Sequence, residues 1–189
     1  IDVDNQLGLK YATQALSAAR ENCDSLRILK AGRIKSLAFR RLGELDSSMH
    51  LSLEMLPIAR RHHYKDELTQ IFNALALIYT HNANYDKALN YCFQSLEIAD
   101  KNENVYVILN NIGFVYYKLE DYDKALTYFE QCLIKKGNLN SEGANTLINM
   151  SLCYAYKKNY SYAKNFVEQA FLICGATCAS SFIVQAKFS

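Results

Sequence analysis

The stretch Tyr85-Asp86-Lys87-Ala88-Leu89 recurs as Tyr122-Asp123-Lys124-Ala125-Leu126, each time at the same place in a longer helical pattern. Tyr79 and Tyr116 repeat with the same separation of 37 positions. A period of this size is typical of proteins built from stacked units, in which each unit buries its apolar face against its neighbours. The chain is therefore predicted to be a solenoid that presents a surface to other molecules.

The repeated pattern has a defined order of side-chain types. A large apolar residue is followed by a hydrophobic/small pair, an aromatic residue, a short turn, a second aromatic residue, alanine, and final aromatic or apolar residues. The clearest copy reads Leu109, Ile112, Gly113, Tyr116, Tyr122, Ala125, Phe129, Cys132 and Leu133. This pattern resembles the tetratricopeptide repeat, a pair of helices with small residues where they cross. The resemblance implies an all-α, right-handed α-solenoid of helix-turn-helix repeats.

Residues 1–189 are expected to form a single solenoid of about four full repeats, with partial repeats at both ends. Since neither end coincides with a repeat boundary and the first Met is Met49, the chain is interpreted as a fragment of a longer protein. The predicted units are a half repeat at 1–24, repeats at about 27–63, 66–102, 104–138 and 141–175, and a partial helix at 179–189.

The first full repeat departs most from the pattern. Lys35 and Ser36 replace the apolar/small pair, and Ser48 replaces alanine, so its helix crossing is expected to be the loosest. Pro57 lies in its second helix, where proline removes a backbone donor and clashes with the preceding turn. We therefore expect a kink there, or a break after Leu56.

Composition narrows the function. The 189 residues are 50% hydrophobic with a formal net charge of +2, so no strong field attracts nucleic acid or an anionic membrane. No segment is apolar enough over 20 residues to suggest a membrane span. A cytoplasmic location is expected, with the periplasm as the alternative if a leader peptide was removed. All seven arginines precede residue 62, which indicates either a carboxylate-binding end or a solvated helix surface.

Neither catalysis nor a cofactor is predicted. The chain contains no Gly-rich phosphate loop, no His-Glu-x-x-His motif and no Gly-x-Ser-x-Gly motif. Cys92, Cys132 and Cys153 occupy positions that small or medium apolar residues usually fill, which favours core packing. Cys174 and Cys178 are spaced for a disulfide in an oxidising compartment or for part of a metal site. With no second pair nearby, no metal is predicted.

The predicted binding surface follows from helix geometry and from the family resemblance. At about 100° per residue, several positions of each first helix point 80 to 180° away from the seam with its partner helix. In tetratricopeptide repeat proteins such positions line a concave groove for a peptide or a helix. The candidate groove residues are Lys30, Arg33, Arg40, Arg41, Gln70, Asn73, His81, Asn110, Asn111, Phe114, Tyr117, Lys118, Asn145, Asn149 and Tyr156.

Asn111 and Asn149 hold the position at which family members that clamp a peptide backbone carry asparagine. An amide suits this task because it both donates and accepts hydrogen bonds. The basic residues of the family's complete carboxylate clamp do not occur in the required order, so specificity for a C-terminal carboxylate is not expected. A groove that is basic at one end and rich in Asn and Tyr at the other suits a segment with acidic residues followed by polar or apolar ones.

The leading interpretation is a non-catalytic module that binds a peptide segment or helix of a partner protein in this groove. The alternative is the sensory or regulatory region of a larger bacterial regulator whose DNA-binding or kinase domain lies outside these residues. Neither reading involves nucleic acid binding by this part of the chain. Open solenoid ends expose apolar surface, so a homodimer through those ends is a further alternative.

Overall fold

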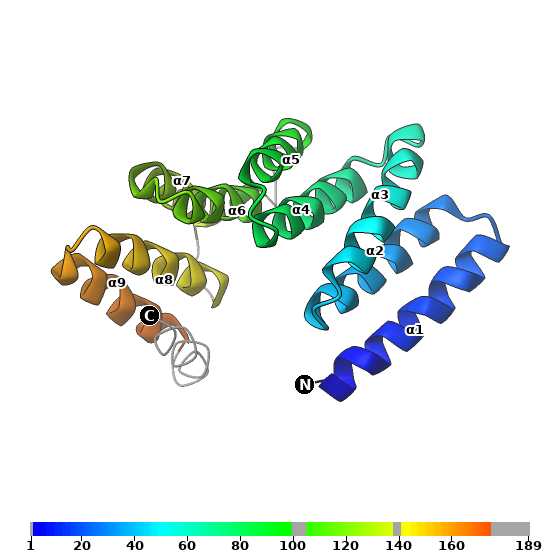
Figure 1. Cartoon of the computed structure of the whole chain (residues 1–189), viewed down its shortest axis with the longest axis horizontal. Coiled ribbons are helices and arrows are strands. Elements are labelled where there is room, and N and C mark those ends of the chain that lie inside the picture. Colours follow the sequence, from blue (N-terminus) through cyan, green and yellow to red (C-terminus); the bar gives the residue numbers. More distant parts are fainter. Residues whose placement is uncertain (1, 100–104, 138–140, 175–189) are drawn as a thin grey trace. The chain divides into compact units, whose positions relative to one another are not determined.

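The computed structural model describes residues 2–99, 105–137 and 141–174, and within these ranges it contains nine helices and no strand (Figure 1). This confirms the predicted all-α fold. The chain divides into an N-terminal unit, residues 1–100, and a C-terminal unit, residues 101–189. The helices are α1 (Asp2–Glu21), α2 (Ser25–Arg41), α3 (Leu45–Arg61), α4 (Lys65–His81), α5 (Tyr85–Ile98), α6 (Val105–Lys118), α7 (Tyr122–Lys136), α8 (Ser141–Tyr156) and α9 (Tyr160–Cys174).

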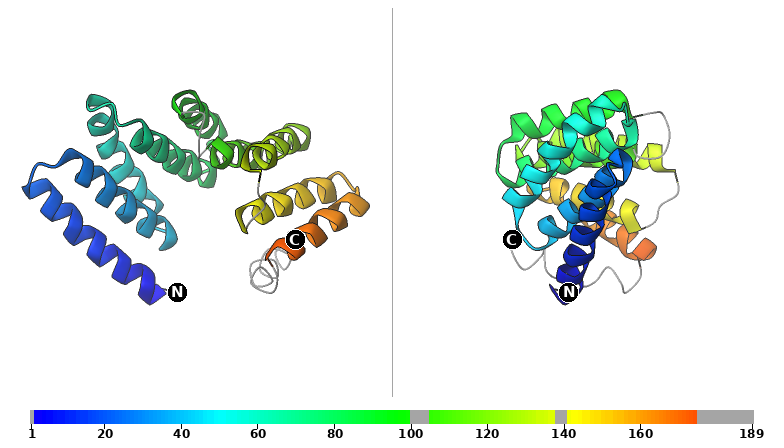
Figure 2. Two further views of the ribbon diagram at one scale, coloured as in Figure 1. Left: turned by 180° about the vertical axis from the view of Figure 1, so that it is seen from behind. Right: turned by 90° about the vertical axis from the view of Figure 1, so that its right-hand side faces the viewer.

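Within each unit, helices that follow one another along the chain pack side by side in opposite directions (Figures 1 and 2). The N-terminal unit contains the pairs α2 with α3 and α4 with α5, preceded by α1. The C-terminal unit contains α6 with α7 and α8 with α9. Each pair begins and ends close to one of the four predicted repeats, whereas the predicted helix at 179–189 lies outside the described residues.

Six of the turns between helices share one backbone design. Each contains a residue with positive φ, between 51° and 80°: Cys23, Gly43, His63, Ala83, Glu120 and Lys158. The following residue donates its N–H to the carbonyl five positions earlier, as Asn84 does to Tyr79 at 2.9 Å. Asn84 is the N-cap of α5, and its side chain accepts the N–H of Lys87 at 3.3 Å. Asparagine in these turns therefore caps a helix, and the left-handed residue is its neighbour.

Small residues lie at the helix crossings, as the repeat pattern predicts. Ala88 and Ala125 are fully buried, and Gly113 packs so closely on Phe129 that no side chain fits between them. Such close approach lets the larger side chains on both sides interdigitate at the density of a normal interior. The crossings therefore fix how each pair of helices presents its exposed positions.

The first repeat is not loose at its crossing. Ser36, Ser48 and Ser52 are buried together, with the Ser36 hydroxyl 2.8 Å from that of Ser48 and 3.1 Å from that of Ser52. The Ser48 hydroxyl also donates to the Ser36 carbonyl at 3.0 Å. These bonds satisfy the buried hydroxyls, so serine replaces alanine at the crossing without leaving an unpaired polar group.

The predicted break after Leu56 is wrong, because α3 continues through Pro57 to Arg61. Pro57 is the fifth residue from the end of the helix and its side chain is exposed. Its missing N–H costs one backbone hydrogen bond, to the carbonyl four residues earlier. The bonds of the final turn remain available to carry the helix to its end.

Cys92, Cys132 and Cys153 are buried, which confirms their predicted place in the core. Cys178 and the side chain of Cys174 lie outside what the structure describes. The described residues hold no group of three or more His, Cys, Asp or Glu side chains suited to a metal. Among the described helices, none combines the length and apolar character that crossing a membrane requires.

Candidate functional site

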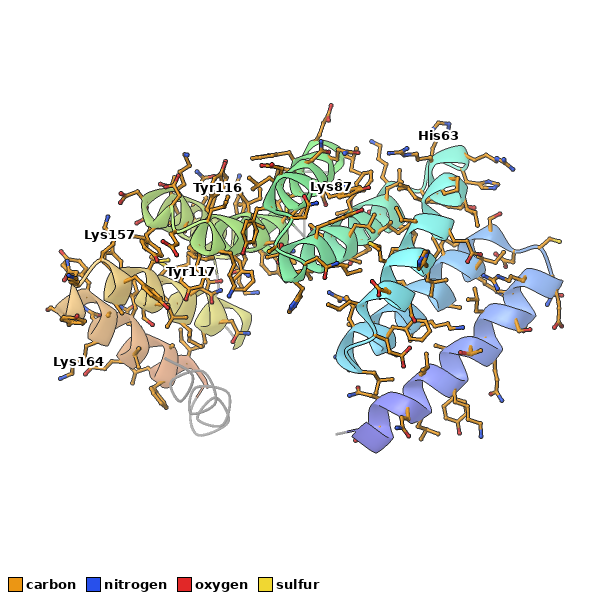
Figure 3. All side chains as sticks on the ribbon, in the orientation of Figure 1. His63, Lys87, Tyr116, Tyr117, Lys157 and Lys164 are labelled. Carbon is orange, nitrogen blue, oxygen red and sulfur yellow. The ribbon has the colours of Figure 1, made fainter. Side chains whose placement is uncertain are left out.

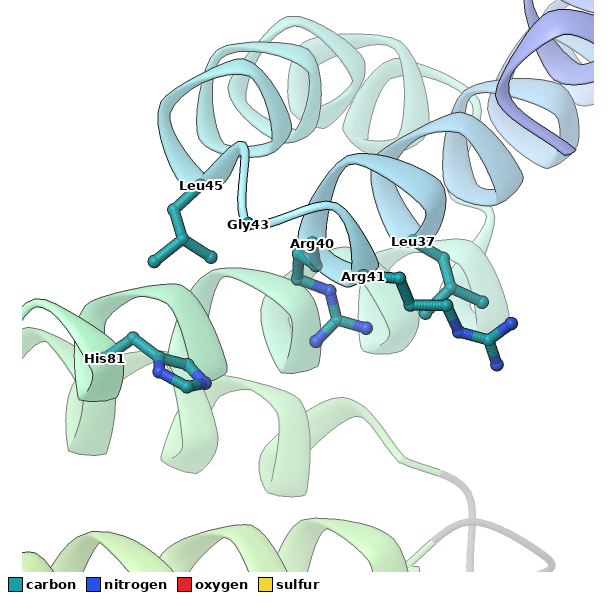
Figure 4. Close-up of a pocket in the computed structure, with 6 residues that line it drawn as sticks. All are labelled: Leu37, Arg40, Arg41, Gly43, Leu45 and His81. Atoms are coloured by element: carbon teal, nitrogen blue, oxygen red, sulfur yellow. The ribbon is translucent and has the colours of Figure 1, made fainter. Parts of the chain in front are cut away.

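In the N-terminal unit, predicted groove positions from two consecutive repeats meet at one pocket of about 370 Å³. The end of α2 contributes two arginines, the turn after it and the start of α3 contribute apolar lining, and the end of α4 contributes a histidine (Figure 4). Two predicted repeats therefore share one site. The residues around it are Leu37, Arg40, Arg41, Gly43, Leu45 and His81.

The positive charge at this pocket is concentrated and not neutralised. Burial, and secondly the charge of Arg41, lower the pKa of Arg40 from its ordinary value, although arginine remains protonated. The Arg40 Nε atom is buried and has no hydrogen-bond partner among the described residues. Within residues 2–99, no ion pair joins a carboxylate to Arg40 or Arg41. An anionic group entering the pocket would meet two guanidinium groups that have no carboxylate partner within residues 2–99.

The other candidate residues of this unit are differently placed. Arg33 lies 3.9 Å from Glu67, so its charge is partly matched. Lys30 is exposed and lines a second pocket of about 340 Å³ between α1 and α2. Gln70 is half-buried. Asn73 is only 7% exposed, and its Oδ1 accepts from a serine hydroxyl of α5 at 3.5 Å.

In the C-terminal unit, the predicted positions form an aromatic cluster. The rings of Phe114 and Tyr117 lie 6.1 Å apart, and the Lys118 ammonium lies over both, at 5.4 and 5.6 Å from their centroids. Tyr117 meets Tyr156 of the next repeat edge-on at 5.9 Å. Tyr122 stacks on Tyr156 at 5.4 Å. The repeat pattern gives Tyr122 as the aromatic residue after the turn and not as a groove residue, because only the packing of α8 against α7 reveals its contact with Tyr156.

Tyr117 has a neutral phenol that holds the cluster together. Burial, followed by its side-chain hydrogen bond with Tyr156, raises the pKa of Tyr117 well above its ordinary value. Tyr156 is still 56% exposed, so it presents an aromatic face while its hydroxyl end is anchored. An apolar or ring-containing side chain could pack on this face with little loss of side-chain freedom.

The residue before Tyr117 points to the opposite side of α6 (Figure 3). Tyr116 stacks on Tyr128 of α7 at 5.5 Å, with the Lys124 ammonium 5.3 Å from its ring centre. The two adjacent tyrosines therefore have different structural roles. One closes the seam between two helices of a repeat, and the other reaches the next repeat.

The four asparagines among the candidate groove residues of the C-terminal unit are not equivalent. The Oδ1 of Asn110 accepts from the Thr146 hydroxyl of α8 at 3.1 Å. Asn111 is 7% exposed, and its Nδ2 has no hydrogen-bond partner among the described residues. Asn145 is exposed, and Asn149 is half-buried. Only some of the asparagines are thus directly accessible to a ligand.

The repeat family can now be stated. The sequence model of the tetratricopeptide repeat matches residues 67–133 and 104–173, which together span more than half of the chain. The chain belongs to the tetratricopeptide repeat family. No curated protein sequence matches it.

Three solved structures show the same tetratricopeptide fold. BtubC from P. vanneervenii is 23% identical with a TM-score of 0.75, over 90% of this chain and 73% of that one. NprR in complex with its cognate peptide NprX is 20% identical with a TM-score of 0.75, over 90% of this chain and about half, 51%, of NprR. A signal transduction ATPase with a tetratricopeptide repeat sensor, from Pyrococcus horikoshii, is 18% identical with a TM-score of 0.74, over 90% of this chain and 28% of that one.

Proposed function

We propose that this tetratricopeptide repeat chain is a non-catalytic interaction module that binds a peptide segment or helix of a partner protein. One observation carries the proposal: in each unit, predicted groove positions from two consecutive repeats lie together. They surround a basic pocket in the N-terminal unit and form an aromatic cluster in the C-terminal unit. Binding surfaces commonly combine aromatic anchors with a few uncommitted polar or charged groups.

The chemistry of the two surfaces indicates what they would bind. Uncommitted guanidinium groups favour acidic side chains, and an exposed tyrosine with an anchored hydroxyl favours apolar or ring-containing ones. NprR, whose structure holds the peptide NprX, has the same fold at 20% identity, which supports the capacity of such a solenoid to hold a peptide. That likeness does not transfer the identity of the peptide.

The test is a selection from a random peptide library with the whole chain, followed by affinity measurements on variants. Tyr156→Ala removes the exposed ring of the cluster, and Tyr160→Ala is its control because Tyr160 is 68% exposed and has no ring contact among the described residues. We expect Tyr156→Ala to weaken the selected peptides by about tenfold, corresponding to roughly 1.4 kcal/mol. The control should leave affinity unchanged.

Two results would contradict the proposal. One is a selection that enriches no sequence over an unrelated helical protein of similar charge. The other is a set of enriched peptides whose affinity is the same for the chain and for both the Tyr156→Ala and Arg41→Gln variants. Thermal unfolding of each variant separates lost binding from lost folding.

A second function has one observation in its favour. The fold of the chain matches 28% of the length of a signal transduction ATPase that has a tetratricopeptide repeat sensor, so it is also proposed as the sensory region of a larger regulator. Sequencing the coding region on both sides of these residues tests this. A DNA-binding or kinase domain would support it, and further repeats followed by a stop codon would refute it.

A further inference from the structure

We propose that Arg40 and Arg41 form a subsite for the carboxylate of a glutamate or aspartate side chain in the segment that this chain binds. The proposal rests on the peptide-binding function given above and assigns a chemical class to one position of the ligand. It follows from the pocket between the ends of α2 and α4, where the charges, their surroundings and the shape of the lining are all defined.

Helix termination does not require these guanidinium groups. At the end of α2, the carbonyl of Ala38 accepts from Leu42 N at 3.0 Å. The carbonyl of Phe39 accepts from Glu44 N at 2.9 Å, and that of Arg40 from Gly43 N at 3.1 Å. The backbone therefore satisfies these terminal carbonyls. A cation here still benefits from the helix dipole, but that effect gives no reason to bury the Arg40 Nε without an acceptor.

A shortage of carboxylates does not explain the unpaired charge either. Residues 1–100 contain twelve Lys and Arg and twelve Asp and Glu. Three of the other five arginines of the unit have partners: Arg20 pairs with a glutamate at 2.5 Å, Arg27 with an aspartate at 3.2 Å and Arg33 with a glutamate at 3.9 Å. Arg60 lies over the Phe72 ring at 5.9 Å, and Arg61 is exposed at the end of α3. The two arginines at the pocket have no such partner within residues 2–99.

The neighbourhood makes an incoming carboxylate favourable. Two adjacent positive charges repel each other, and partial burial of Arg40 strengthens that repulsion. A carboxylate bound to both guanidinium groups would remove the repulsion. Hydrogen bonds between guanidinium and carboxylate groups are roughly twice as strong as neutral ones and are often bidentate.

The shape of the pocket favours a carboxylate on an aliphatic stem. Leu37 and Leu45 line the pocket beside the charged groups, so methylene groups would contact apolar surface. Gly43 lies in the lining, and a Cβ built on it would meet no atom within 4 Å, so the turn leaves open space there. A volume of about 370 Å³ accommodates a whole side chain and not only its charged end. His81 completes the polar side (Figure 4).

The experiment follows the Arg Nε–Hε resonances of the whole chain by NMR during titration with N-acetyl-glutamate amide. Its uncharged isostere N-acetyl-glutamine amide and inorganic phosphate serve as comparison probes. We expect saturable shifts of the Arg40 and Arg41 resonances with the glutamate probe, none with the glutamine probe, and weaker saturation with phosphate. Arg61, which is exposed at the end of α3 and has no ion pair among the described residues, should not shift.

Matched variants complete the test. Arg41→Gln should weaken binding of the glutamate probe at least tenfold, whereas Arg61→Gln removes the same charge from the same unit and should leave it unchanged. Arg40→Lys keeps the charge but loses the guanidinium fork and is expected to weaken binding less than Arg41→Gln. Equal shifts at Arg61, equal effects of both Gln variants, or tighter binding of phosphate than of glutamate would overturn the assignment.

Failure of this subsite can be distinguished from failure of the proposed function. If selected peptides bind but leave the Arg40 and Arg41 resonances unchanged, the carboxylate subsite is wrong and peptide binding stands. If the glutamate probe saturates these resonances while the library yields no peptide, the pocket binds carboxylates and the peptide-binding function is wrong.

Discussion

Replacing Gly113 with alanine tests whether close packing at a helix crossing shapes the C-terminal unit. A Cβ at this position would lie 2.7 Å from two atoms of the Phe129 ring and 3.1 Å from a third. Phe129 is fully buried in the core of that unit, so the ring has no free space into which it could move. Overpacking of this kind costs about 1–3 kcal/mol. Replacing glycine by alanine inside a helix by itself increases the free energy of unfolding by about 1 kcal/mol, because alanine has the higher helix propensity. The expected net loss of unfolding free energy is therefore about 1 kcal/mol.

Urea denaturation followed by circular dichroism measures this change, and Gly8→Ala is the matched control. Gly8 also lies inside a helix, but a Cβ there meets no atom within 4 Å, so this variant should gain roughly 0.5–1 kcal/mol. In a Phe129→Leu background the added methyl group at position 113 should cost less or become favourable, since the ring is gone. If Gly113→Ala stabilised the chain as much as Gly8→Ala does, the packing argument would be refuted.

Two other predictions concern thiols and turns. Burial raises the pKa of Cys92 and Cys153 to about 12, so at pH 8 both should resist alkylation until the chain unfolds, as mass spectrometry of labelled peptides can show. Because the folded-state pKa exceeds the ordinary value of 9, their contribution to stability is complete below pH 9 and is lost as the pH rises toward 12, which denaturant titrations at several pH values can detect. Glu120 and Lys158 have φ of 61° and 59°, a conformation that glycine adopts without strain. Glycine at either position should therefore increase the free energy of unfolding by up to about 1 kcal/mol and raise the melting temperature. The control Glu130→Gly, inside α7, should decrease the free energy of unfolding by a similar amount and lower the melting temperature. A fall in melting temperature for both turn variants would contradict this.

The helix pairs were predictable because their determinants are local and repeat. A period of 37 positions places alanine at equivalent crossings, and Ala88 and Ala125 are indeed fully buried. The effect of Pro57 was less predictable. The cost of proline depends on how many turns follow it, and helix ends are poorly defined by sequence. The serine cluster of the first repeat was missed because hydroxyls compensate one another only when the partner helix brings them together.

The same distinction applies to the predicted binding surface. The direction in which a side chain points follows from its own helix, whereas its exposure also depends on the neighbouring helices. A helical projection measures each position against the seam with its own partner helix, but a first helix in a solenoid is also covered by the following repeat. Asn110 illustrates this, since it accepts a hydrogen bond from Thr146 of α8. Asn111 lies in the middle of α6 and is only 7% exposed, although the projection directs it away from the seam. Asn73 is equally buried, but its Oδ1 accepts from Ser95 of α5, the partner helix of its own repeat.

The last residues of the first helices remain exposed. Arg41, His81, Lys118 and Tyr156 are the last residues of α2, α4, α6 and α8, and all four are exposed. They hold equivalent positions in successive repeats, so the repeat period sets where they occur and the helix end sets their accessibility. Because the same position is basic in the first repeat and aromatic in the fourth, one backbone position can select a different side chain of a partner in each repeat. The residues at the ends of the first helices would then determine most of the partner specificity of this chain. The buried asparagines in the middle of these helices contribute to helix packing instead.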